Sequence, residues 1–377
     1  MTAFAWGLGK SGQLGNGKQE KCILPQEMIW KCGNKKHKIV EVECGALYTC
    51  VLTSKGELYS TGCGKYGRLG TGQENDVATL TRVPVDGIVV KFSCGIWHGC
   101  AVTDKGKLWG WGNNKKQILG APTQYSTLTS GPIPIDIPGK VIGVSCGNNF
   151  TLVWTENGSL YSWGSGRHGV LGHGDFRDKI TPTKVEELKD IKVVSGNAGF
   201  AHCGVVTDCG DVYMFGKGFD GELGLGSNFL KDVAVPTKVP SLGGIKELSC
   251  NVGENHGHTL AISLQGDVYT WGDGYKGKLG TGNQDSYNTP QKIPRDNFSG
   301  DEIMHVSAGG IHSAAVSKEG RVFTWGCGSD GRLGHPEAEG HRYLFRSDIP
   351  RVVDIIQDKG KALGVTCSYY HTACVIE

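Results

Sequence analysis

WGSGRHGVLG, residues 163–172, is the clearest copy of a ten-residue phrase that the chain contains seven times. The other copies begin at Trp6, Thr61, Trp111, Phe215, Trp271 and Trp325. Successive copies start between 50 and 56 residues apart. A fixed period near fifty residues is typical of propellers and solenoids, in which no single repeat buries its own core. The period therefore predicts a single domain over residues 1–377, although a chain of this length commonly holds two or three.

Each repeat has the pattern of four short strands. The stretch 90–112, VKFSCGIWHGCAVTDKGKLWGWG, alternates apolar and polar residues on both sides of a tight turn at Gly106. The phrase then leaves the third strand through a glycine-rich loop, and a proline-led strand such as the one at Pro132 follows. Four short strands per repeat form one blade of a β-propeller. We therefore predict an all-β fold with seven blades.

The two ends of the chain match different parts of one blade. FAWG at the start corresponds to the third strand of a repeat, and HTACVIE at the end corresponds to the second. Residues 3–6 should therefore pair with residues 372–376, so that N-terminal strands complete the C-terminal blade. The resulting closed ring removes the open sheet edge that a linear array would leave.

Composition narrows the classes of function. The net charge of +2 does not favour direct nucleic-acid binding through bulk electrostatics. The first residues lack the features of a signal peptide, and no apolar run is long enough to predict a membrane span. In such a chain, 14 cysteines are expected to be free thiols, which predicts an intracellular protein, cytoplasmic or nuclear.

The cysteines do not have the spacing of a metal site. No Cys-x-x-Cys pair is present, and zinc sites usually contain clustered pairs. Cys44, Cys94, Cys146 and Cys367 occupy one repeat position, where a cysteine is expected to act as a small buried hydrophobe. We therefore predict no metal site and no cofactor.

Five histidines share one repeat position, and Tyr48 and Phe150 replace them in the other two copies. These histidines are His98, His202, His258, His312 and His371. Because each belongs to a different blade, we expect them to bridge neighbouring blades by hydrogen bonds and not to gather as a metal or proton-relay set. Their place around the axis also makes them candidates for partner contact.

Two connections break the repeat, and irregular loops on a rigid scaffold often carry function. Residues 17–41 and 335–361 form these connections. They supply the partner-binding candidates Trp30, Lys35, Lys36, Lys38, Arg342, Tyr343 and Arg346. The lysine-rich part indicates either an acidic partner or a solvated loop.

The third phrase, at 111–120, departs from the others. It lacks two of the usual glycines and contains Lys115 and Lys116, which indicates either drift or a loop that contacts an acidic partner. Trp97, beside the ring histidine His98, and Asn149 are further partner-binding candidates.

Enzymatic chemistry is not indicated. Six of the seven phrases contain G-x-G-x-x-G, but a strand follows each where a dinucleotide site needs a helix. No Ser-His-Asp, paired-carboxylate or Cys-His arrangement stands out, so no catalytic residue is predicted.

The repeated phrase and the C-G-x-x-H stretch resemble those of the regulator of chromosome condensation family over the whole chain. The resemblance implies a seven-bladed propeller, but fold and function separate. Members of the family include an exchange factor for the small GTPase Ran that docks on nucleosomes, a plant UV-B photoreceptor, a bacterial β-lactamase inhibitor and many interaction modules.

We therefore predict a non-enzymatic, monomeric protein-binding scaffold or regulator, and the resemblance implies a small GTPase as the partner class. The alternative is a guanine-nucleotide exchange factor for Ran or another small GTPase, with chromatin association. The resemblance implies a wedge in the third phrase and two aspartates for exchange. Here that phrase keeps its ordinary length, and Asn149 and Lys10 stand at the two places. A third alternative is light sensing, for which the resemblance implies a cage of tryptophans and arginines. Trp97 is the only tryptophan of this sequence beside a ring histidine, which does not favour such a cage.

Overall fold

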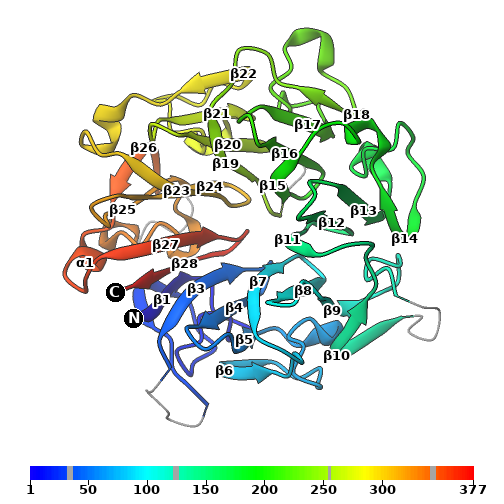
Figure 1. Ribbon diagram of the computed structural model, residues 1–377. Helices are drawn as coiled ribbons and strands as arrows, with labels where there is room; N and C mark the ends of the chain where they lie inside the picture. Colours follow the sequence, from blue (N-terminus) through cyan, green and yellow to red (C-terminus); the bar gives the residue numbers. More distant parts are fainter. Residues whose placement is uncertain (32–36, 122–126, 254–255, 340–344) are drawn as a thin grey trace.

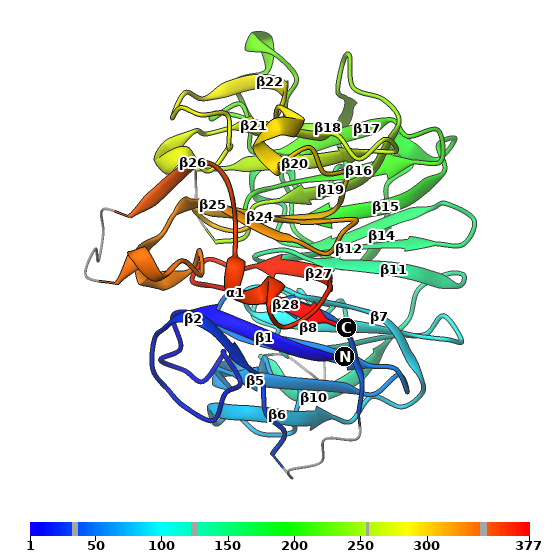
Figure 2. The same cartoon turned by 90° about the vertical axis from the view of Figure 1, so that its left-hand side faces the viewer.

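Seven four-stranded antiparallel sheets surround a central axis in the computed structural model, which describes residues 1–31, 37–121, 127–253, 256–339 and 345–377 (Figure 1). We number these blades in chain order of their innermost strands. A view turned by 90° shows the ring from the side (Figure 2). The prediction of an all-β, seven-bladed propeller is confirmed. No helix among the described residues is long and apolar enough to span a membrane.

The strands of each blade are given from the axis outward. Blade 1 consists of β3 (Ile39–Cys44), β4 (Tyr48–Thr53), β5 (Leu58–Gly62) and β6 (Val77–Val83). Blade 2 consists of β7 (Val89–Cys94), β8 (His98–Thr103), β9 (Leu108–Asn113) and β10 (Leu128–Ile135). Blade 3 consists of β11 (Val141–Cys146), β12 (Phe150–Thr155), β13 (Leu160–Gly164) and β14 (Lys179–Lys184). Blade 4 consists of β15 (Val193–Ala198), β16 (His202–Thr207), β17 (Val212–Gly216) and β18 (Val233–Lys238). Blade 5 consists of β19 (Ile245–Cys250), β20 (His258–Ser263), β21 (Val268–Gly272) and β22 (Tyr287–Lys292).

Blade 6 consists of β23 (Ile303–Ala308), β24 (His312–Ser317), β25 (Val322–Cys327) and β26 (Arg346–Val352). Blade 7 consists of β27 (Ala362–Cys367), β28 (His371–Ile376), β1 (Thr2–Gly7) and β2 (Cys22–Glu27). The short helix α1 (Asp354–Gln357) connects these two blades. Short 3-10 helices lie in the connections, at Lys65–Gly67, Arg167–Gly169, Glu186–Leu188, Ser227–Phe229, Tyr275–Gly277, Arg295–Phe298, Ser329–Gly331 and Pro336–Ala338.

Blade 7 closes the ring as the sequence predicts. Its strand order is β2-β1-β28-β27, so that each end of the chain supplies two strands. Ala3 lies opposite Val375 and Trp6 lies opposite Thr372. Figures 1 and 2 both show dark blue β1 beside red β28.

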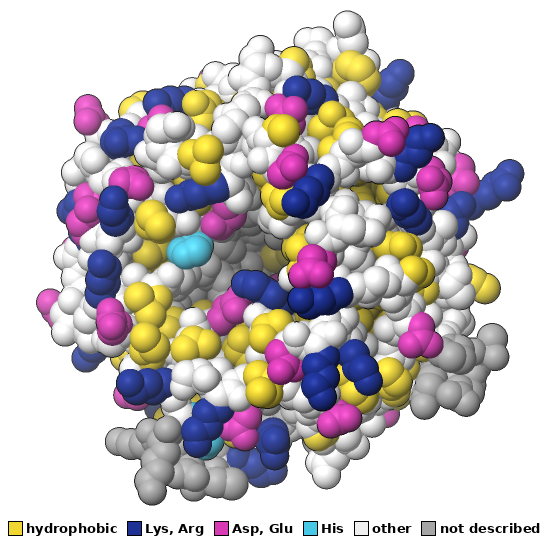
Figure 3. Space-filling model, viewed as in Figure 1, with side chains coloured by type: hydrophobic (Ala, Val, Ile, Leu, Met, Phe, Trp, Pro, Cys, Tyr) yellow, Lys and Arg dark blue, Asp and Glu magenta, His cyan; other side chains and the backbone are white. Residues whose placement is uncertain are grey.

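A ring of hydrogen bonds links the innermost strands around the axis. In each blade, a polar side chain at the same repeat position accepts a hydrogen bond from a backbone N–H of the next innermost strand, at donor–acceptor distances of 2.7 to 3.2 Å. The accepting residues are Glu43, Ser93, Ser145, Asn197, Ser249, Ser307 and Thr366. The last bond joins blade 7 to blade 1. These side chains line a central channel, and the space-filling view is hollowed there (Figure 3).

The tryptophan that opens a phrase fastens its blade to the preceding one. Five such indoles are fully buried, and each donates Nε1–H to a backbone carbonyl of the preceding blade at 2.8 to 3.0 Å. These residues are Trp6, Trp111, Trp163, Trp271 and Trp325. Truncating such a buried indole to alanine typically costs about 3–5 kcal/mol, so this position explains much of the phrase.

The five ring histidines bridge neighbouring blades. Each imidazole Nε2 lies 2.8 to 2.9 Å from a Thr or Ser hydroxyl of the next blade. That hydroxyl donates its proton to the carbonyl at the eighth phrase position of the histidine's own blade. The hydroxyl oxygen must therefore accept a hydrogen bond from Nε2–H of the histidine. The neutral imidazole thus carries its proton on Nε2. Burial lowers the pKa of His202 and of His371 to about 3.

The two interfaces without histidine also lack the hydroxyl partner. Tyr48 faces Gly99 and donates its hydroxyl proton to the His98 carbonyl at 2.7 Å. Phe150 belongs to the interface in which Cys203 takes the hydroxyl position, and the Cys203 thiol donates to the Val170 carbonyl at 3.2 Å. Histidine and hydroxyl therefore occur together or not at all.

Candidate protein-interaction surface

The ten-residue phrases gather on one face of the ring. Because neighbouring strands are antiparallel, the connection between the first two strands and the phrase after the third lie at the same end of each blade. In all seven blades the backbone N–H of the third phrase residue donates to a carbonyl of that first connection, at 2.8 to 3.0 Å. We call this end of the propeller the loop face.

Glycine fixes the backbone of these loops. Six phrases have glycine at the seventh position, with φ between 72° and 83°. A Cβ built there would lie only 2.5 to 2.8 Å from a Cα of the next blade's outer strand. The third phrase has Gln117 at this place, and its φ of 55° puts a non-glycine residue in the left-handed region. The constant glycines leave the fifth, sixth and eighth positions free to vary.

The fifth phrase position forms the exposed tip of six loops, and its chemistry changes around the ring. In blade 6 the position is Ser329, which is buried. Four neighbouring blades, 7 and 1 to 3, present an exposed cation there: Lys10, Lys65, Lys115 and Arg167. We call these four residues the basic arc. Blades 4 and 5 present Phe219 and Tyr275, which are 58% and 54% exposed, and we call them the aromatic pair. Like charges on neighbouring tips produce a positive potential that attracts acidic surfaces.

The eighth phrase position lies buried between blades, below the tips. The seven residues there are at most 3% exposed: Gln13, Arg68, Ile118, Val170, Glu222, Lys278 and Arg332. Ile118 and Val170 fill the place in two blades, so the fold does not need a charge there. A buried ion pair is often no more stabilising than an apolar replacement. Three of the four charged residues, Arg68, Lys278 and Arg332, donate to backbone carbonyls of the loop face and so hold its connections in place.

Arg68 belongs to a cluster of cations and aromatic rings between blades 1 and 2. Its guanidinium carbon lies 4.9 Å from the Trp97 ring centroid, within the range of a cation–π contact. Tyr66 packs edge-on against Trp97 at 5.8 Å, and Lys115 Nζ lies 5.4 Å from the Tyr66 centroid. The Trp97 indole also donates to Asn148 Oδ1 at 3.0 Å. The half-buried rings are thus held in fixed orientations beside the basic arc.

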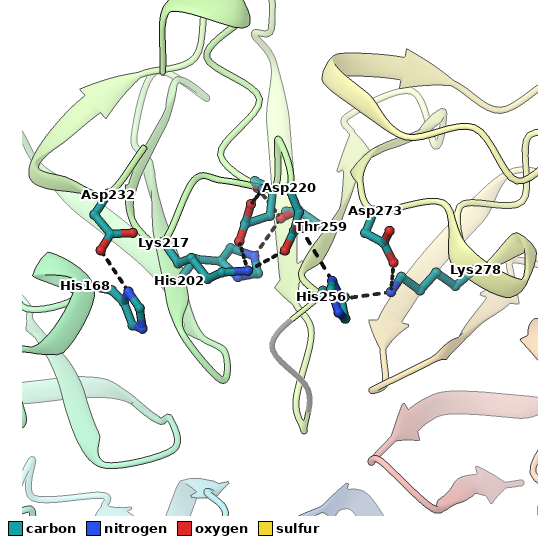
Figure 4. Close-up of polar contacts among 10 residues, drawn as sticks. His168, His202, Lys217, Asp220, Asp232, His256, Thr259, Asp273 and Lys278 are labelled. Atoms are coloured by element: carbon teal, nitrogen blue, oxygen red, sulfur yellow. Dashed lines mark hydrogen bonds and ion pairs between the residues drawn. The ribbon is translucent and has the colours of Figure 1, made fainter. Parts of the chain in front are cut away.

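A second charged cluster lies between blades 4 and 5 (Figure 4). Lys217 Nζ pairs with the Asp220 carboxylate and lies 3.4 Å from Glu222 Oε1. His256 Nδ1 is 3.6 Å from Asp220 Oδ1, and Lys278 Nζ donates to the His256 carbonyl at 2.9 Å. Lys278 thus reaches His256 from the side opposite Asp220 (Figure 4).

Burial shifts the protonation of this second cluster. It raises the pKa of Glu222 to about 7, although Lys217 nearby acts in the opposite direction. Burial also lowers the pKa of Lys217, but the hydrogen bond to Asp220 and the charges of Glu222 and Asp220 outweigh it, so the pKa is raised overall. The cluster therefore combines a lysine that stays charged with a carboxyl that titrates near neutral pH.

The structure separates the residues predicted from the sequence into three groups. Trp97, Lys115, Lys116, Asn149 and Arg346 lie on the loop face. Asn149 lines a small pocket with Arg167 and His168, and Arg346 Nε lies 3.2 Å from Asp348 Oδ1.

Other predicted residues lie away from that face. Trp30, in the connection from blade 7 to blade 1, packs edge-on against Tyr59 at 4.8 Å. Lys38 is exposed just before β3. Lys35, Lys36, Arg342 and Tyr343 lie outside the described residues.

The ring histidines need a correction. His98, His202, His258, His312 and His371 are at most 1% exposed and are engaged between blades. We therefore withdraw them as partner contacts. The prediction that they bridge neighbouring blades is confirmed.

Sequence reasoning missed the tips and the buried charges of the loop face. Lys10, Lys65, Arg167, Phe219 and Tyr275 were not predicted as contact residues. The signal was present in the aligned phrases, because the fifth position reads Lys, Lys, Lys, Arg, Phe, Tyr, Ser in chain order. Arg68, Glu222, Lys278 and Arg332 stand out in the same way at the eighth position.

Comparison with known proteins agrees with this architecture. A family model described as RCC1-like domain matches residues 2–374. The ultraviolet-B receptor UVR8 of Arabidopsis thaliana is 32% identical over 375 residues, covering 99% of this chain and 70% of that protein. The human E3 ubiquitin-protein ligase HERC2 is 30% identical over the whole chain, which spans only 6% of that protein.

Two solved structures resemble the whole ring. Human WBSCR16 has a TM-score of 0.85 at 23% identity, covering 100% of this chain and 98% of that one. Prp20p of Saccharomyces cerevisiae has a TM-score of 0.83 at 21% identity, covering 99% and 90%, and its structural study concerns binding to Gsp1p and histones. At these identities the likeness establishes the fold alone.

Proposed function

The chain belongs to the RCC1-like domain family, and from that premise we propose that it is a protein-binding propeller whose loop face docks a partner with an acidic surface. The observation that carries the proposal is the basic arc, four exposed cations on four neighbouring blades, next to the aromatic pair. Phe219 and Tyr275 are large rings exposed by more than half on loops of fixed geometry. Such rings are typical anchors of protein interfaces.

The two parts of the surface have different tasks in this proposal. Lys10, Lys65, Lys115 and Arg167 steer an acidic partner toward the loop face and set its orientation, since charged groups contribute mainly to association rate and specificity. The aromatic pair supplies apolar area at the edge of the charged surface. Rigid loops reduce the entropy lost when the partner binds.

A small GTPase is the partner class to test first. Support comes from the likeness to Prp20p, whose structural study names Gsp1p as a binding partner. An intracellular location remains part of the proposal, and it is supported by the cysteines, all of which are free thiols among the described residues. A monomeric scaffold or regulator is the form in which we propose that the protein acts.

Binding without fast nucleotide exchange is the form of GTPase regulation that we propose. Lys10 and Asn149 stand where the family resemblance implies carboxylates, and both lie on the loop face, Lys10 exposed and Asn149 half-buried. A lysine at an exposed tip cannot replace the negative charge of an aspartate. We therefore expect little release of a fluorescent guanine nucleotide from Ran. Rapid release at micromolar propeller would favour the exchange-factor alternative.

The test of binding is a pull-down with the intact chain as bait, compared with two charge-reversal variants. The first changes Lys10, Lys65, Lys115 and Arg167 to Glu. The control changes Lys55, Lys105, Lys107 and Lys189 to Glu, which reverses as many exposed charges at the opposite end of the blades.

We expect the loop-face variant to lose the partners that the wild type and the control retain, and the loss to be mimicked by high salt. Small GTPases among the retained proteins would support the partner class. Equal recovery by both variants would contradict the loop-face proposal.

A further inference from the structure

Three side chains with metal-ligating atoms meet inside the interface between blades 2 and 3. His98 begins β8, Cys100 lies two residues later on the same strand, and Cys146 ends β11 of the next blade. One ring nitrogen of His98 and the two Sγ atoms all lie within 4.8 Å of one another. The three residues are at most 2% exposed.

The hydrogen bonds of His98 leave one nitrogen available in this group. Nε2 lies 2.8 Å from Thr151 Oγ1, and Thr151 donates its own proton to the Ile118 carbonyl at 3.0 Å. Nε2 therefore carries the imidazole proton, and Nδ1 keeps its lone pair. Nδ1 of His98 is buried, and its neighbour in this group is the thiol of Cys146, which interacts with the imidazole. A histidine ligand is usually oriented in this way, by donating its other N–H to an oxygen.

The other histidine interfaces of the same ring provide an internal comparison. At the positions equivalent to Cys100 and Cys146 they have these pairs: Gly204 and Cys250, Leu260 and Ala308, Ala314 and Cys367, and Ala373 and Cys44. Each of them lacks at least one of the two thiols. Over the residues that the structure describes, His98, Cys100 and Cys146 are the one such group of three. The Tyr48 interface has both thiols, Cys50 and Cys94, but no histidine. The feature that sets the interface between blades 2 and 3 apart is therefore the imidazole together with two thiols.

We propose that His98, Cys100 and Cys146 bind a zinc ion that joins blade 2 to blade 3. Zinc binds imidazole nitrogen and thiolate sulfur, and three protein ligands are sufficient when a fourth position is left for water. On binding, each thiol releases one proton, so that Zn²⁺ and two thiolates form a group without net charge. Neutrality matters because an uncompensated charge inside this buried interface would be costly. A Cu⁺ ion with the same ligands would leave a net negative charge.

The place of the ligands explains why spacing did not reveal them. The sequence predicts no metal site, because no Cys-x-x-Cys pair is present. Here two ligands come from one repeat and the third from the next, and the packing of neighbouring blades brings them together. The site lies between the blades whose tips are Lys115 and Arg167, so bound zinc would hold two members of the basic arc in a fixed relation.

The test measures zinc in protein purified without chelators. We expect one zinc ion per chain in the wild type and loss of zinc in Cys100→Ala and in Cys146→Ala. Cys250→Ala is the matched control, because Cys250 ends the equivalent strand two blades further on and its interface lacks a second thiol. The control should retain the zinc of the wild type. Circular dichroism compares the folding of all four proteins.

Cobalt provides a second readout that does not depend on the Cys100 and Cys146 variants folding. Because the site is buried, metal must enter during folding, so wild type and Cys250→Ala are unfolded, stripped and refolded with Co²⁺. We expect thiolate-to-cobalt charge-transfer absorption in both, and zinc should displace it. Absence of zinc from the purified wild type, together with absence of this absorption after refolding, would overturn the proposal. Zinc retained by Cys100→Ala, a disulfide between Cys100 and Cys146, or copper in place of zinc would overturn it as well.

Discussion

Replacement of Glu43 by glutamine should stabilise the propeller at alkaline pH. Among the seven accepting residues named for the ring around the axis, Glu43 is the one carboxylate and the other six are neutral. Its Oε1 accepts from the Cys94 backbone at 3.0 Å and from the Ser93 hydroxyl at 3.0 Å. Burial raises the pKa of Glu43 from 4.5 to about 7. A glutamine keeps the accepting oxygen without the charge.

The sign of the effect follows from the protons bound in each state. Between pH 4.5 and about 7, folded Glu43 holds a proton that the unfolded chain releases. The free energy of unfolding therefore falls as pH rises through this window. A pKa rise of that size corresponds to about 3 kcal/mol for a fully desolvated group. Because Glu43 lines the channel and keeps some solvent contact, we expect about 1–3 kcal/mol.

Urea denaturation below and above the window, at about pH 5 and about pH 8, measures the difference. The Glu43→Gln protein should match the wild type at the lower pH and exceed it at the higher pH. Glu41→Gln is the control, because it removes a channel carboxylate of the same strand and leaves the ring of hydrogen bonds untouched. A Glu43→Gln protein that is less stable than the wild type at about pH 8, or that has the same pH dependence, would refute the reasoning.

Four further predictions concern the framework. Gln117→Gly should raise stability by about 0.5–1 kcal/mol in thermal denaturation, because glycine adopts the left-handed conformation of this position without strain; an unchanged or lower stability contradicts it. His258→Phe should lower the free energy of unfolding in urea by about 1–2 kcal/mol, since the Ser313 hydroxyl loses the group that donates to it. Adding Ser313→Cys should recover part of the loss, because the interface of Phe150 pairs a phenylalanine with a cysteine in the same way. Removal of residues 2–7 should cost several kcal/mol, because blade 7 loses β1 from its middle; a truncated protein that melts with the intact chain would argue against the closed ring. Mass spectrometry after denaturing alkylation without reductant should find all 14 cysteines reduced, and a reductant-sensitive pair would contradict an intracellular location.

The framework could be predicted from the sequence because it repeats. The phrase tryptophan and the glycine of the seventh position have the same neighbours in nearly every blade, so their constancy reveals their role. Tyr48 and Phe150 were informative for the same reason, since their replacement of histidine favoured packing over metal binding. The structure adds the partner rule, in which a histidine occurs where the next blade offers a hydroxyl.

The candidate surface was harder to predict because its residues are the ones that do not repeat. The irregular connections predict Trp30 and Lys38 as contact residues, but these two residues lie away from the loop face. Lys10 and Phe219 belong to regular phrases, in which the constant glycines and not the variable positions make the pattern visible. The proximity of His98 and Cys146 depends on the packing of two blades, which no spacing within one repeat encodes.

The constant backbone of the loops has a consequence for how a partner finds its orientation. A ring of seven similar loops offers an approaching protein seven nearly equivalent rotational poses, related by steps of one blade. Four cations in succession, followed by two aromatic rings and a serine, remove that degeneracy, because every other pose would place the aromatic pair or the buried Ser329 where the partner presents acidic groups. The order of the tip residues thus selects one rotational orientation of the bound partner. Exchanging tip residues between blades, with glycines and tryptophans unchanged, would turn the bound partner about the propeller axis rather than release it.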